Sequence, residues 1–190
     1  MYTGKRVILA SQSPRRKQLL EQAGIPFEVK VVDTAETFPA DMHIPDVPVH
    51  IARQKSAAVA ALCSSEDIII TADTVVVLDD MIIGKPKDRD DAIKILSALS
   101  GRTHRVITGV VITHNGKEES FSKETEVHFK PLTNAQITYY IDEYKPYDKA
   151  GAYAIQEWIG VVGIRSINGD FYNVMGLPVS RVIRELNKLM

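Results

Sequence analysis

The chain has 190 residues, of which 45% are hydrophobic and 25% are charged, a composition typical of a soluble globular protein. Its 23 Lys and Arg residues are balanced by 24 Asp and Glu residues, and the net charge of −1 argues against a nucleic-acid or membrane-surface partner. No apolar run approaches the roughly 20 residues that cross a bilayer. Residues 1–6 lead into a strand without a signal-peptide pattern, so we expect a cytoplasmic protein. The single cysteine, Cys63, is expected to be buried at the end of a helix.

The first predicted strand, residues 7–10, leads through two serines into a helix over residues 14–23. Ser13 is a good N-cap and Pro14 a good first helical residue, because proline lacks the N–H that would be unpaired there. The free N–H groups of the first turn and the helix dipole favour an anion. Three cations follow directly: Arg15, Arg16 and Lys17. The stretch predicts a polyphosphate site without the glycine spacing of a P-loop; the alternative is an ordinary strand–turn–helix connection with a solvated basic helix.

The later elements intermix strands and helices. A strand over residues 27–32 precedes an irregular stretch, residues 33–48, whose length is usual for functional or mobile loops. Asn115-Gly116 joins two strands in a hairpin, and Thr133 with Gln136 forms a capping box. The remaining strands are predicted over residues 68–78, 81–84, 106–113, 118–129 and 161–167, and the helices over residues 49–62, 88–99, 133–143 and 178–189. This order predicts an α/β fold with a mixed sheet.

One carboxylate stands inside an apolar strand. Asp73 lies between Ile68-Ile69-Ile70-Thr71-Ala72 and Val75-Val76-Val77. Such a carboxylate is paired, bound to a metal or catalytic, because an isolated buried charge costs too much; the alternative is an aspartate that caps a neighbouring turn. The five histidines lack zinc-ligand spacing, and no G-x-S-x-G motif indicates a hydrolase triad. His104 is expected to anchor a loop or the start of a strand.

Four further polar residues are candidates for a site. Lys55 shares the side of an apolar helix stripe, which favours a pocket. Lys85 precedes a proline that restricts its backbone, and a rigidly held lysine suits a contact to phosphate. Glu36 can supply a second oxygen ligand to a hard cation, and Gln156 has the donor and acceptor needed to read a nucleobase edge. For each of these the alternative is a solvated surface position.

Six motifs occur in order along nearly the whole chain. They are Leu9-Ala10-Ser11-Gln12-Ser13-Pro14-Arg15-Arg16, Ala72-Asp73-Thr74-Val75-Val76, Gly84-Lys85-Pro86-Lys87, Leu99-Ser100-Gly101-Arg102-Thr103-His104, Asp148-Lys149-Ala150-Gly151-Ala152-Tyr153-Ala154-Ile155-Gln156 and Asn173-Val174-Met175-Gly176-Leu177-Pro178. Together these motifs closely resemble the Maf-like nucleoside triphosphate pyrophosphatase family.

The resemblance implies a fold and an activity. The expected fold is α/β, an elongated mixed sheet with helices in two lobes around a central cleft, similar to inosine triphosphate pyrophosphatases. It would form a single domain over residues 1–190. The expected reaction cleaves a nucleoside triphosphate between its α and β phosphates, giving the monophosphate and pyrophosphate, with Mg²⁺ or Mn²⁺ as cofactor.

The resemblance also implies residue roles. Asp73 matches the catalytic acidic residue and, with Glu36, the metal-binding carboxylates. The phosphate-site positions match Ser11, Arg16, Lys55 and Lys85. Three positions separate a branch that prefers dTTP and UTP from one that prefers 7-methyl-GTP, and here they match the dTTP/UTP branch: Arg15, Thr74 and Gln156. Residues 157–160, Glu-Trp-Ile-Gly, are bulkier than the small-residue turn expected there, which would reshape one wall of the base pocket.

Two other functions remain as alternatives. One is a regulator of cell division that binds nucleotides without turnover, although binding alone does not require a carboxylate facing polyphosphate. The other is a hydrolase of different nucleotide conjugates that uses the same cleft. The expected partner is the nucleoside triphosphate alone, and a homodimer is one option for the oligomeric state.

Overall fold

The computed structural model describes residues 4–189. Residues 1–3, which begin the segment considered for a signal peptide, and residue 190 lie outside the described residues. The strands are β1 (Val7–Leu9), β2 (Glu28–Val29), β3 (Ile68–Leu78), β4 (Met81–Ile83), β5 (Thr103–His114), β6 (Lys117–Phe129) and β7 (Ile164–Asn168). The helices are α1 (Pro14–Gln22), α2 (Val47–Ala60), α3 (Arg89–Leu99), α4 (Asn134–Tyr144), α5 (Trp158–Gly163), α6 (Phe171–Met175) and α7 (Val179–Asn187), with 3₁₀ turns at η1 (Ile44–Asp46) and η2 (Ala150–Ala152). None of the helices within residues 4–189 has both the length and the apolar character to cross a bilayer.

The strands form one sheet in the order β2-β1-β3-β5-β6-β7, with β4 paired to β3. Strand β1 runs parallel to β2 and β3, whereas β3–β4 and β6–β7 are antiparallel pairs. The predicted mixed α/β fold is therefore confirmed. The hairpin turn between β5 and β6 is confirmed as well, because Asn115 and Gly116 both have the positive φ that a two-residue type I′ turn requires.

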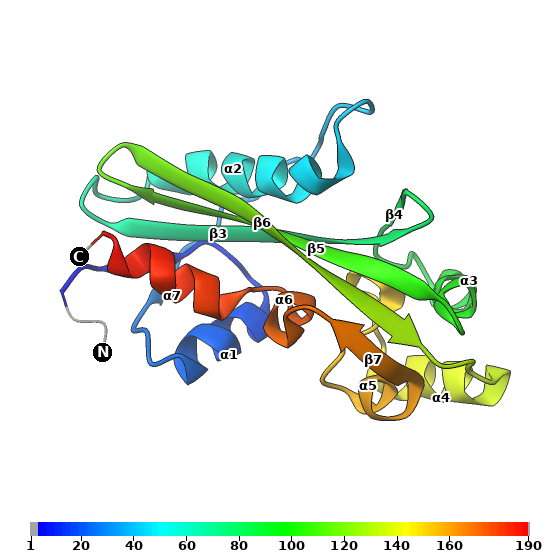
Figure 1. Cartoon of the computed structure of the whole chain (residues 1–190). Helices are drawn as coiled ribbons and strands as arrows, with labels where there is room; N and C mark the ends of the chain where they lie inside the picture. Colours follow the sequence, from blue (N-terminus) through cyan, green and yellow to red (C-terminus); the bar gives the residue numbers. More distant parts are fainter. Residues whose placement is uncertain (1–3, 190) are drawn as a thin grey trace. The chain divides into compact units, whose positions relative to one another are not determined.

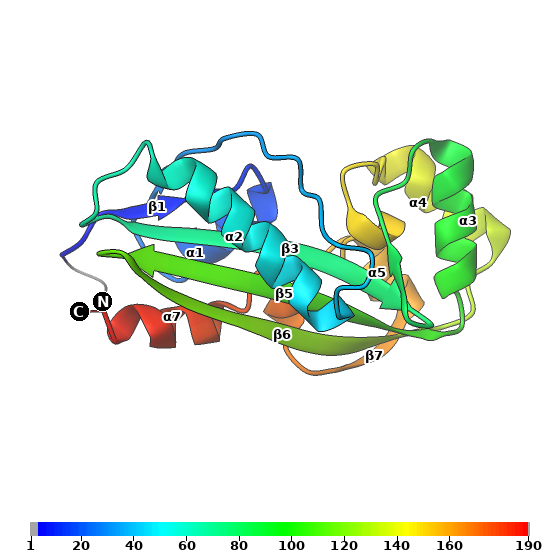
Figure 2. The same cartoon turned by 90° about the horizontal axis from the view of Figure 1, so that it is seen from above.

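The described chain forms two compact units. The first consists of residues 4–73, 108–123 and 176–189, and the second of residues 74–107 and 124–175. In the first unit, α2 covers one side of the strands, while α1 and α7 lie on the other side (Figure 1). In the second unit, α3 and α4 lie side by side (Figure 2). The single domain over residues 1–190 and its cleft stay predictions.

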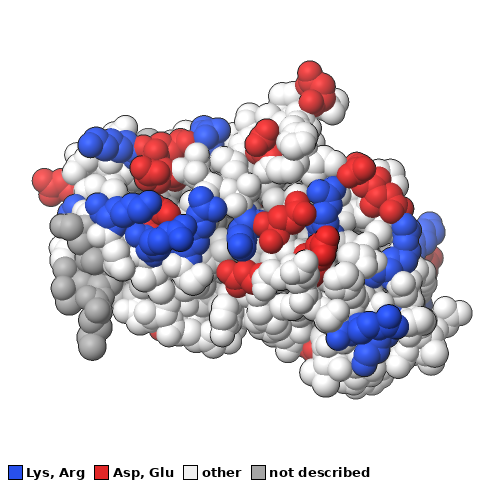
Figure 3. Space-filling view, in the orientation of Figure 1, with Lys and Arg blue, Asp and Glu red and all other residues white. Residues whose placement is uncertain are grey.

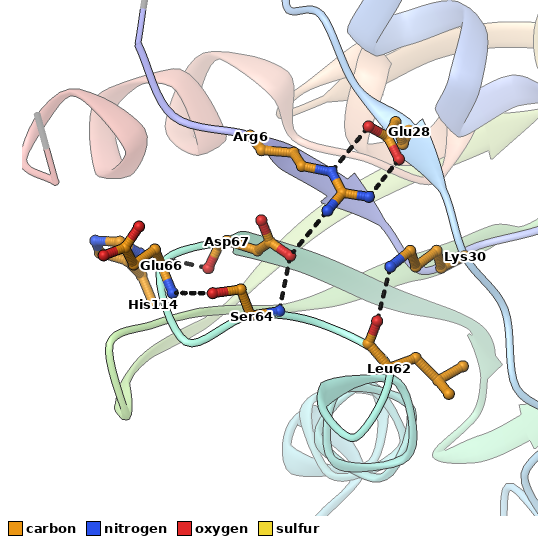
Figure 4. Close-up of polar contacts among 8 residues, drawn as sticks. All are labelled: Arg6, Glu28, Lys30, Leu62, Ser64, Glu66, Asp67 and His114. Carbon is orange, nitrogen blue, oxygen red and sulfur yellow. Dashed lines mark hydrogen bonds and ion pairs between the residues drawn. The ribbon is translucent and has the colours of Figure 1, made fainter.

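The starts of the three parallel strands of the first unit are tied together by charges. Arg6, just before β1, donates two hydrogen bonds to Glu28 of β2, at 2.8 and 2.6 Å (Figure 4). Its other terminal nitrogen lies 3.6 Å from the carboxylate of Asp67, just before β3, which also accepts from the backbone N–H of Ser64. These ion pairs occupy the amino ends of the strands. Ser11 lies just past the carboxyl end of β1, where parallel sheets usually hold their ligands, and Asp73 lies in the middle of β3, past the residues of β3 that pair with β1.

A buried aromatic cluster forms part of the core of the second unit. The imidazole Nε2 of His104 lies 2.6 Å from the hydroxyl of Tyr153, and both rings pack edge-on against Phe129. Burial lowers the pKa of His104 to about 4 and raises that of Tyr153, so both side chains are neutral at pH 7. The expectation that His104 anchors the start of a strand is confirmed, since it is the second residue of β5.

One predicted strand is confirmed over most of its length but begins later than expected. Residues 161–167 were expected to be extended, but residues 158–163 form α5 and only residues 164–168 form β7. A methyl group at Gly160 would lie 1.7 Å from the carbonyl oxygen of Ile155, and one at Gly163 would lie 2.9 Å from Leu132. The segment is thus packed so closely that a side chain at Gly160 does not fit, and one at Gly163 would require Leu132 to move. The short helix α6 was not predicted.

Other errors are smaller. The strand expected over residues 27–32 is reduced to β2, whereas the strand expected over residues 68–78 is confirmed as β3. Helix α2 begins at Val47, because proline is tolerated in the first turn of a helix, where Pro48 lies. Cys63 lies past the end of α2 and is only half-buried, which corrects the expectation of a buried position.

Candidate functional site

A buried arginine lies in the first turn of α1. Ser13 caps this helix, because its hydroxyl accepts from the backbone N–H of Arg16 at 3.4 Å, as the sequence predicts. The Arg16 guanidinium donates to the carbonyl oxygen of Gly176 at 2.8 Å and to the hydroxyl of Ser11 at 3.2 Å. Both of these acceptors are neutral.

Burial lowers the pKa of Arg16, and the nearby charges of Asp73 and Glu36 oppose that shift only in part. A buried guanidinium at a helix N-terminus is a favourable place for an anion to bind, because the helix dipole and the guanidinium charge act together. Arg15, the next residue toward the cap, is half-buried in the same helix turn.

A lysine shared by two carboxylates forms the second group of the first unit. The ammonium of Lys55, on α2, lies 2.8 Å from Asp73 Oδ1 in the middle of β3 and 2.9 Å from Glu36 Oε1 in the loop before η1. The side chains of Lys55 and Asp73 are 16% and 15% exposed, whereas that of Glu36 is 45% exposed. Of the explanations for a carboxylate within an apolar strand, pairing is confirmed for Asp73. The three residues come from separate segments, and β3 and α2 hold two of them rigidly.

Helix α2 also holds the backbone beside Glu36. The side-chain amide of Gln54 donates to the carbonyl oxygen of Thr37 at 2.7 Å. Glu36 itself has a positive φ of 49°, a left-handed conformation that costs energy in a residue other than glycine. Two successive residues of α2 thus fix this loop, Gln54 at the backbone and Lys55 at the carboxylate. Gln54 was missed by the sequence reasoning, since nothing in its local pattern separates it from an exposed helix residue.

The carboxylates beside Lys55 supply some of the ligands that a hard divalent cation needs. Asp73 and Glu36 supply carboxylate oxygens, the ligand type that Mg²⁺ and Mn²⁺ prefer. Within residues 4–189 there is no cluster of three or more His, Cys, Asp or Glu side chains arranged to hold a metal. Two carboxylates are the number that Mg²⁺ commonly takes from a protein when substrate phosphates and water supply its remaining ligands.

The other predicted residues belong to the second unit. Thr74 follows Asp73 in β3 and is half-buried, and Lys85 is exposed just after β4. Gln156 is exposed directly after five buried residues, 151–155. The backbone N–H of Gly151 donates to the carbonyl oxygen of Gly84 at 3.1 Å, which joins the segments that carry Lys85 and Gln156.

The structure thus brings Ser11 to Arg16, and Glu36 and Asp73 to Lys55. On the face drawn in Figure 3, basic and acidic side chains are interspersed, apart from a group of adjoining basic side chains toward the left of the view.

Comparison with known proteins gives consistent matches. The model of the family described as Maf-like protein matches residues 6–189. A dTTP/UTP pyrophosphatase of Phocaeicola vulgatus is 51% identical over 185 residues, covering 97% of this chain and 96% of the relative. Proteins of the same name from Cytophaga hutchinsonii and Porphyromonas gingivalis are 50% and 48% identical, covering 96% and 95% of this chain and 84% and 92% of the relatives. Among solved structures, a HAM1 protein from Coxiella burnetii matches with a TM-score of 0.45 and 14% identity, covering 66% of this chain and 73% of that one.

Proposed function

Because the chain belongs to the Maf-like protein family, we propose that it hydrolyses dTTP and UTP to the nucleoside monophosphate and pyrophosphate. The relatives that carry this name are about half identical to the chain and match it over nearly its full length. The structural observation that carries the proposal is the contact of Asp73 and Glu36 with the Lys55 ammonium. Pure nucleotide binding has no need of two carboxylates beside a phosphate site, so the non-catalytic regulator is not favoured.

Charge neutralisation is the first task of such a site. A triphosphate carries several negative charges that repel an incoming water and must be stabilised on the departing pyrophosphate. The buried guanidinium of Arg16 and the dipole of α1 are preorganised for this, because their positions are fixed before substrate binds. Lys55 and Lys85 would add point charges to the phosphate oxygens.

Asp73 is proposed to act on the attacking water. Its carboxylate orients the water or accepts its proton, so that the water oxygen bonds to the α-phosphorus while the bond to the bridging oxygen breaks and its electron pair leaves with pyrophosphate. Held in the middle of β3 and paired with Lys55, this carboxylate has a fixed position from which to do so.

We also propose that Glu36 and Asp73 hold Mg²⁺ or Mn²⁺ during the reaction. The ion would neutralise phosphate charge and polarise the phosphoryl oxygens as a Lewis acid. For base selection, Gln156 would pair with the O4 and N3–H edge of uracil or thymine, with Arg15 and Thr74 contributing to the same preference. The substrate is the only partner proposed, and the cytoplasm, where nucleoside triphosphates are made and used, is the proposed place of action.

The test is the kcat/KM of the purified protein for the eight common nucleoside triphosphates, with identification of the phosphate product. We expect dTTP and UTP to be the best substrates and pyrophosphate to be released. GTP as the best substrate would contradict the assigned base preference, and orthophosphate as the product would contradict cleavage between the α and β phosphates. Tight binding without turnover would favour the regulator instead.

A further inference from the structure

A single tyrosine hydroxyl ties α4 to both sides of Gln156. Tyr140 is fully buried on α4. Its hydroxyl accepts from the backbone N–H of Ala154 at 3.1 Å and donates to the carboxylate of Glu157. These two residues lie two positions before and one position after Gln156. One hydroxyl group therefore uses both its acceptor and its donor capacity on the short segment that presents the Gln156 side chain.

The carboxylate of Glu157 has a second partner. Its Oε1 lies 3.7 Å from the ammonium of Lys149, which also lies 2.8 Å from Asp148. The side chains of Lys149 and Glu157 are largely buried, and charge interactions are stronger there than in water. Glu157 is thus held from two directions, by α4 and by the segment before η2.

Backbone hydrogen bonds and close packing also hold the residues around Gln156. The N–H of Glu157 donates to the carbonyl oxygen of Ala154 at 3.1 Å, and the N–H of Gly160 donates to that of Glu157 at 2.9 Å. Gly160 lies so close to Ile155 that a methyl group in its place would overlap the Ile155 carbonyl oxygen. Residues 151–155 are buried, and Gln156 is exposed.

We propose that Tyr140 and Glu157 are positioning residues for nucleobase selection. They hold the turn of residues 154–157 so that the Gln156 amide meets the base in one orientation. Base discrimination by an amide depends on placing its donor and acceptor opposite the right groups, and a turn that can shift or rotate loses that discrimination. Glu157, the bulky residue after Gln156, thus stabilises the turn, in addition to any change it makes to the wall of the base pocket. This inference rests on the proposed function.

The first test is Tyr140→Phe, which removes the hydroxyl and keeps the ring stacked on Tyr144. The net value of one intramolecular hydrogen bond corresponds to about a 3- to 10-fold effect, and we expect the kcat/KM ratio of UTP to CTP to fall by about that factor. The loss should arise mainly from a higher KM for UTP, with kcat less affected. The matched control is Tyr144→Phe, the same chemical change one helical turn away, which should keep the wild-type ratio.

A second pair of variants keeps the test decisive if Tyr140→Phe folds poorly. Glu157→Ala removes the carboxylate and should lower the same ratio. Glu157→Gln keeps an oxygen that accepts from the Tyr140 hydroxyl and should recover most of it. Thermal unfolding identifies which variants are folded at the assay temperature. A merely structural role would lower activity toward all nucleotides alike and leave the ratio unchanged.

The outcomes separate the two proposals. The wild type and Gln156→Ala are measured in the same panel. If the wild type does not prefer UTP, the proposed function fails, whatever Tyr140 does. If the wild type prefers UTP and Gln156→Ala abolishes the preference, but the folded Tyr140→Phe and Glu157→Ala proteins keep the wild-type ratio, the positioning inference is overturned.

Discussion

The chemistry of Asp73 depends on its contact with Lys55 and, through Lys55, on Glu36. Its carboxylate meets the Lys55 ammonium, which in turn meets Glu36. A charge that is paired in this way can remain in the middle of a strand, because the pairing offsets much of its cost of desolvation. The same arrangement holds the carboxylate in a fixed position for a reaction at phosphorus.

The Asp73→Asn variant tests this role. We expect turnover to fall by about 10²- to 10⁴-fold, the usual contribution of a positioned general base. Binding of dTTP, measured by calorimetry, should be unchanged or tighter, because one negative charge beside the triphosphate is gone. Asp79→Asn, at the exposed turn between β3 and β4, is the matched control and should retain turnover. Near-wild-type turnover in Asp73→Asn would exclude the proposed role.

His104 makes stability depend on pH. Its pKa is about 4 in the folded protein, where burial disfavours the charged ring, against an ordinary value of 6.5. Between those values the unfolded chain binds a proton that the folded chain does not, so stability is lost as the pH falls from about 6.5 toward 4.

From pH 7 to pH 5 this single group should cost about 2 kcal/mol of the free energy of unfolding. Urea unfolding at the two pH values measures the loss. His104→Gln, which cannot titrate, should lose correspondingly less over the same interval. An equal loss in both proteins would show that His104 is not the group responsible.

Helix α2 is the element on which the first unit's carboxylate group depends. It carries both Gln54 and Lys55, and its first turn lies directly on the middle of β5 at Gly109. A methyl group at Gly109 would lie 2.2 Å from the backbone nitrogen of Val49 and 2.4 Å from the carbonyl carbon of Pro48. Backbone atoms cannot move aside as a side chain can, so any larger residue at this position must displace the helix.

Gly109→Ala is therefore expected to lower the free energy of unfolding by about 1–3 kcal/mol, the usual cost of overpacking, and to reduce kcat/KM through displacement of Lys55. Denaturant unfolding and steady-state kinetics measure the two effects. Gly84→Ala serves as the stability control, because a methyl group there meets no atom within 4 Å. Equal stability of the two variants would mean that α2 can be displaced at little cost.

At the scale of the whole molecule, the proposed roles are divided by side-chain chemistry: cations for the phosphates, and other polar residues for the base. Arg16 and Lys55 belong to the first unit and Lys85 to the second. Base selection is assigned mainly to Thr74 and Gln156 of the second unit, with Arg15 of the first. The proposed division of labour thus follows the chemistry of the side chains and does not coincide with the division of the chain into units.

These proposed roles predict how the phosphate-site variants affect kcat/KM for different nucleotides. Arg16→Ala, Lys55→Ala and Lys85→Ala should each lower kcat/KM by about 10- to 1,000-fold, the range for single electrostatic stabilisers. The loss should be alike for every nucleotide, because phosphates carry no base identity, and it is measured across the same eight nucleotides. A loss confined to one base would move that cation from the phosphate site to the base pocket.

Patterns local in the chain were read correctly from the sequence. The Ser13 cap, the Thr133–Gln136 capping box and the Asn115-Gly116 turn each depend on hydrogen bonds or φ angles within four residues, which is why a short motif predicts them. Pairing was one of the three explanations offered for Asp73, with metal binding and catalysis, and it is confirmed. The sequence could suggest it because the cost of burying a charge follows from the apolar residues on either side.

Only the tertiary structure decided where distant partners meet. Nothing near Lys55 in the sequence indicates that one ammonium serves both Glu36 and Asp73, and nothing near Gln156 indicates that Tyr140 ties its flanks to α4. The helix at residues 158–163 was also missed, because its valines have strand propensity. Sequence alone thus determined the family, because its motifs occur in order along the chain. It also determined the helix caps and the tight turns, because these depend on residues close together in the chain. The geometry of the candidate site depends on side chains that approach each other only after the chain has folded.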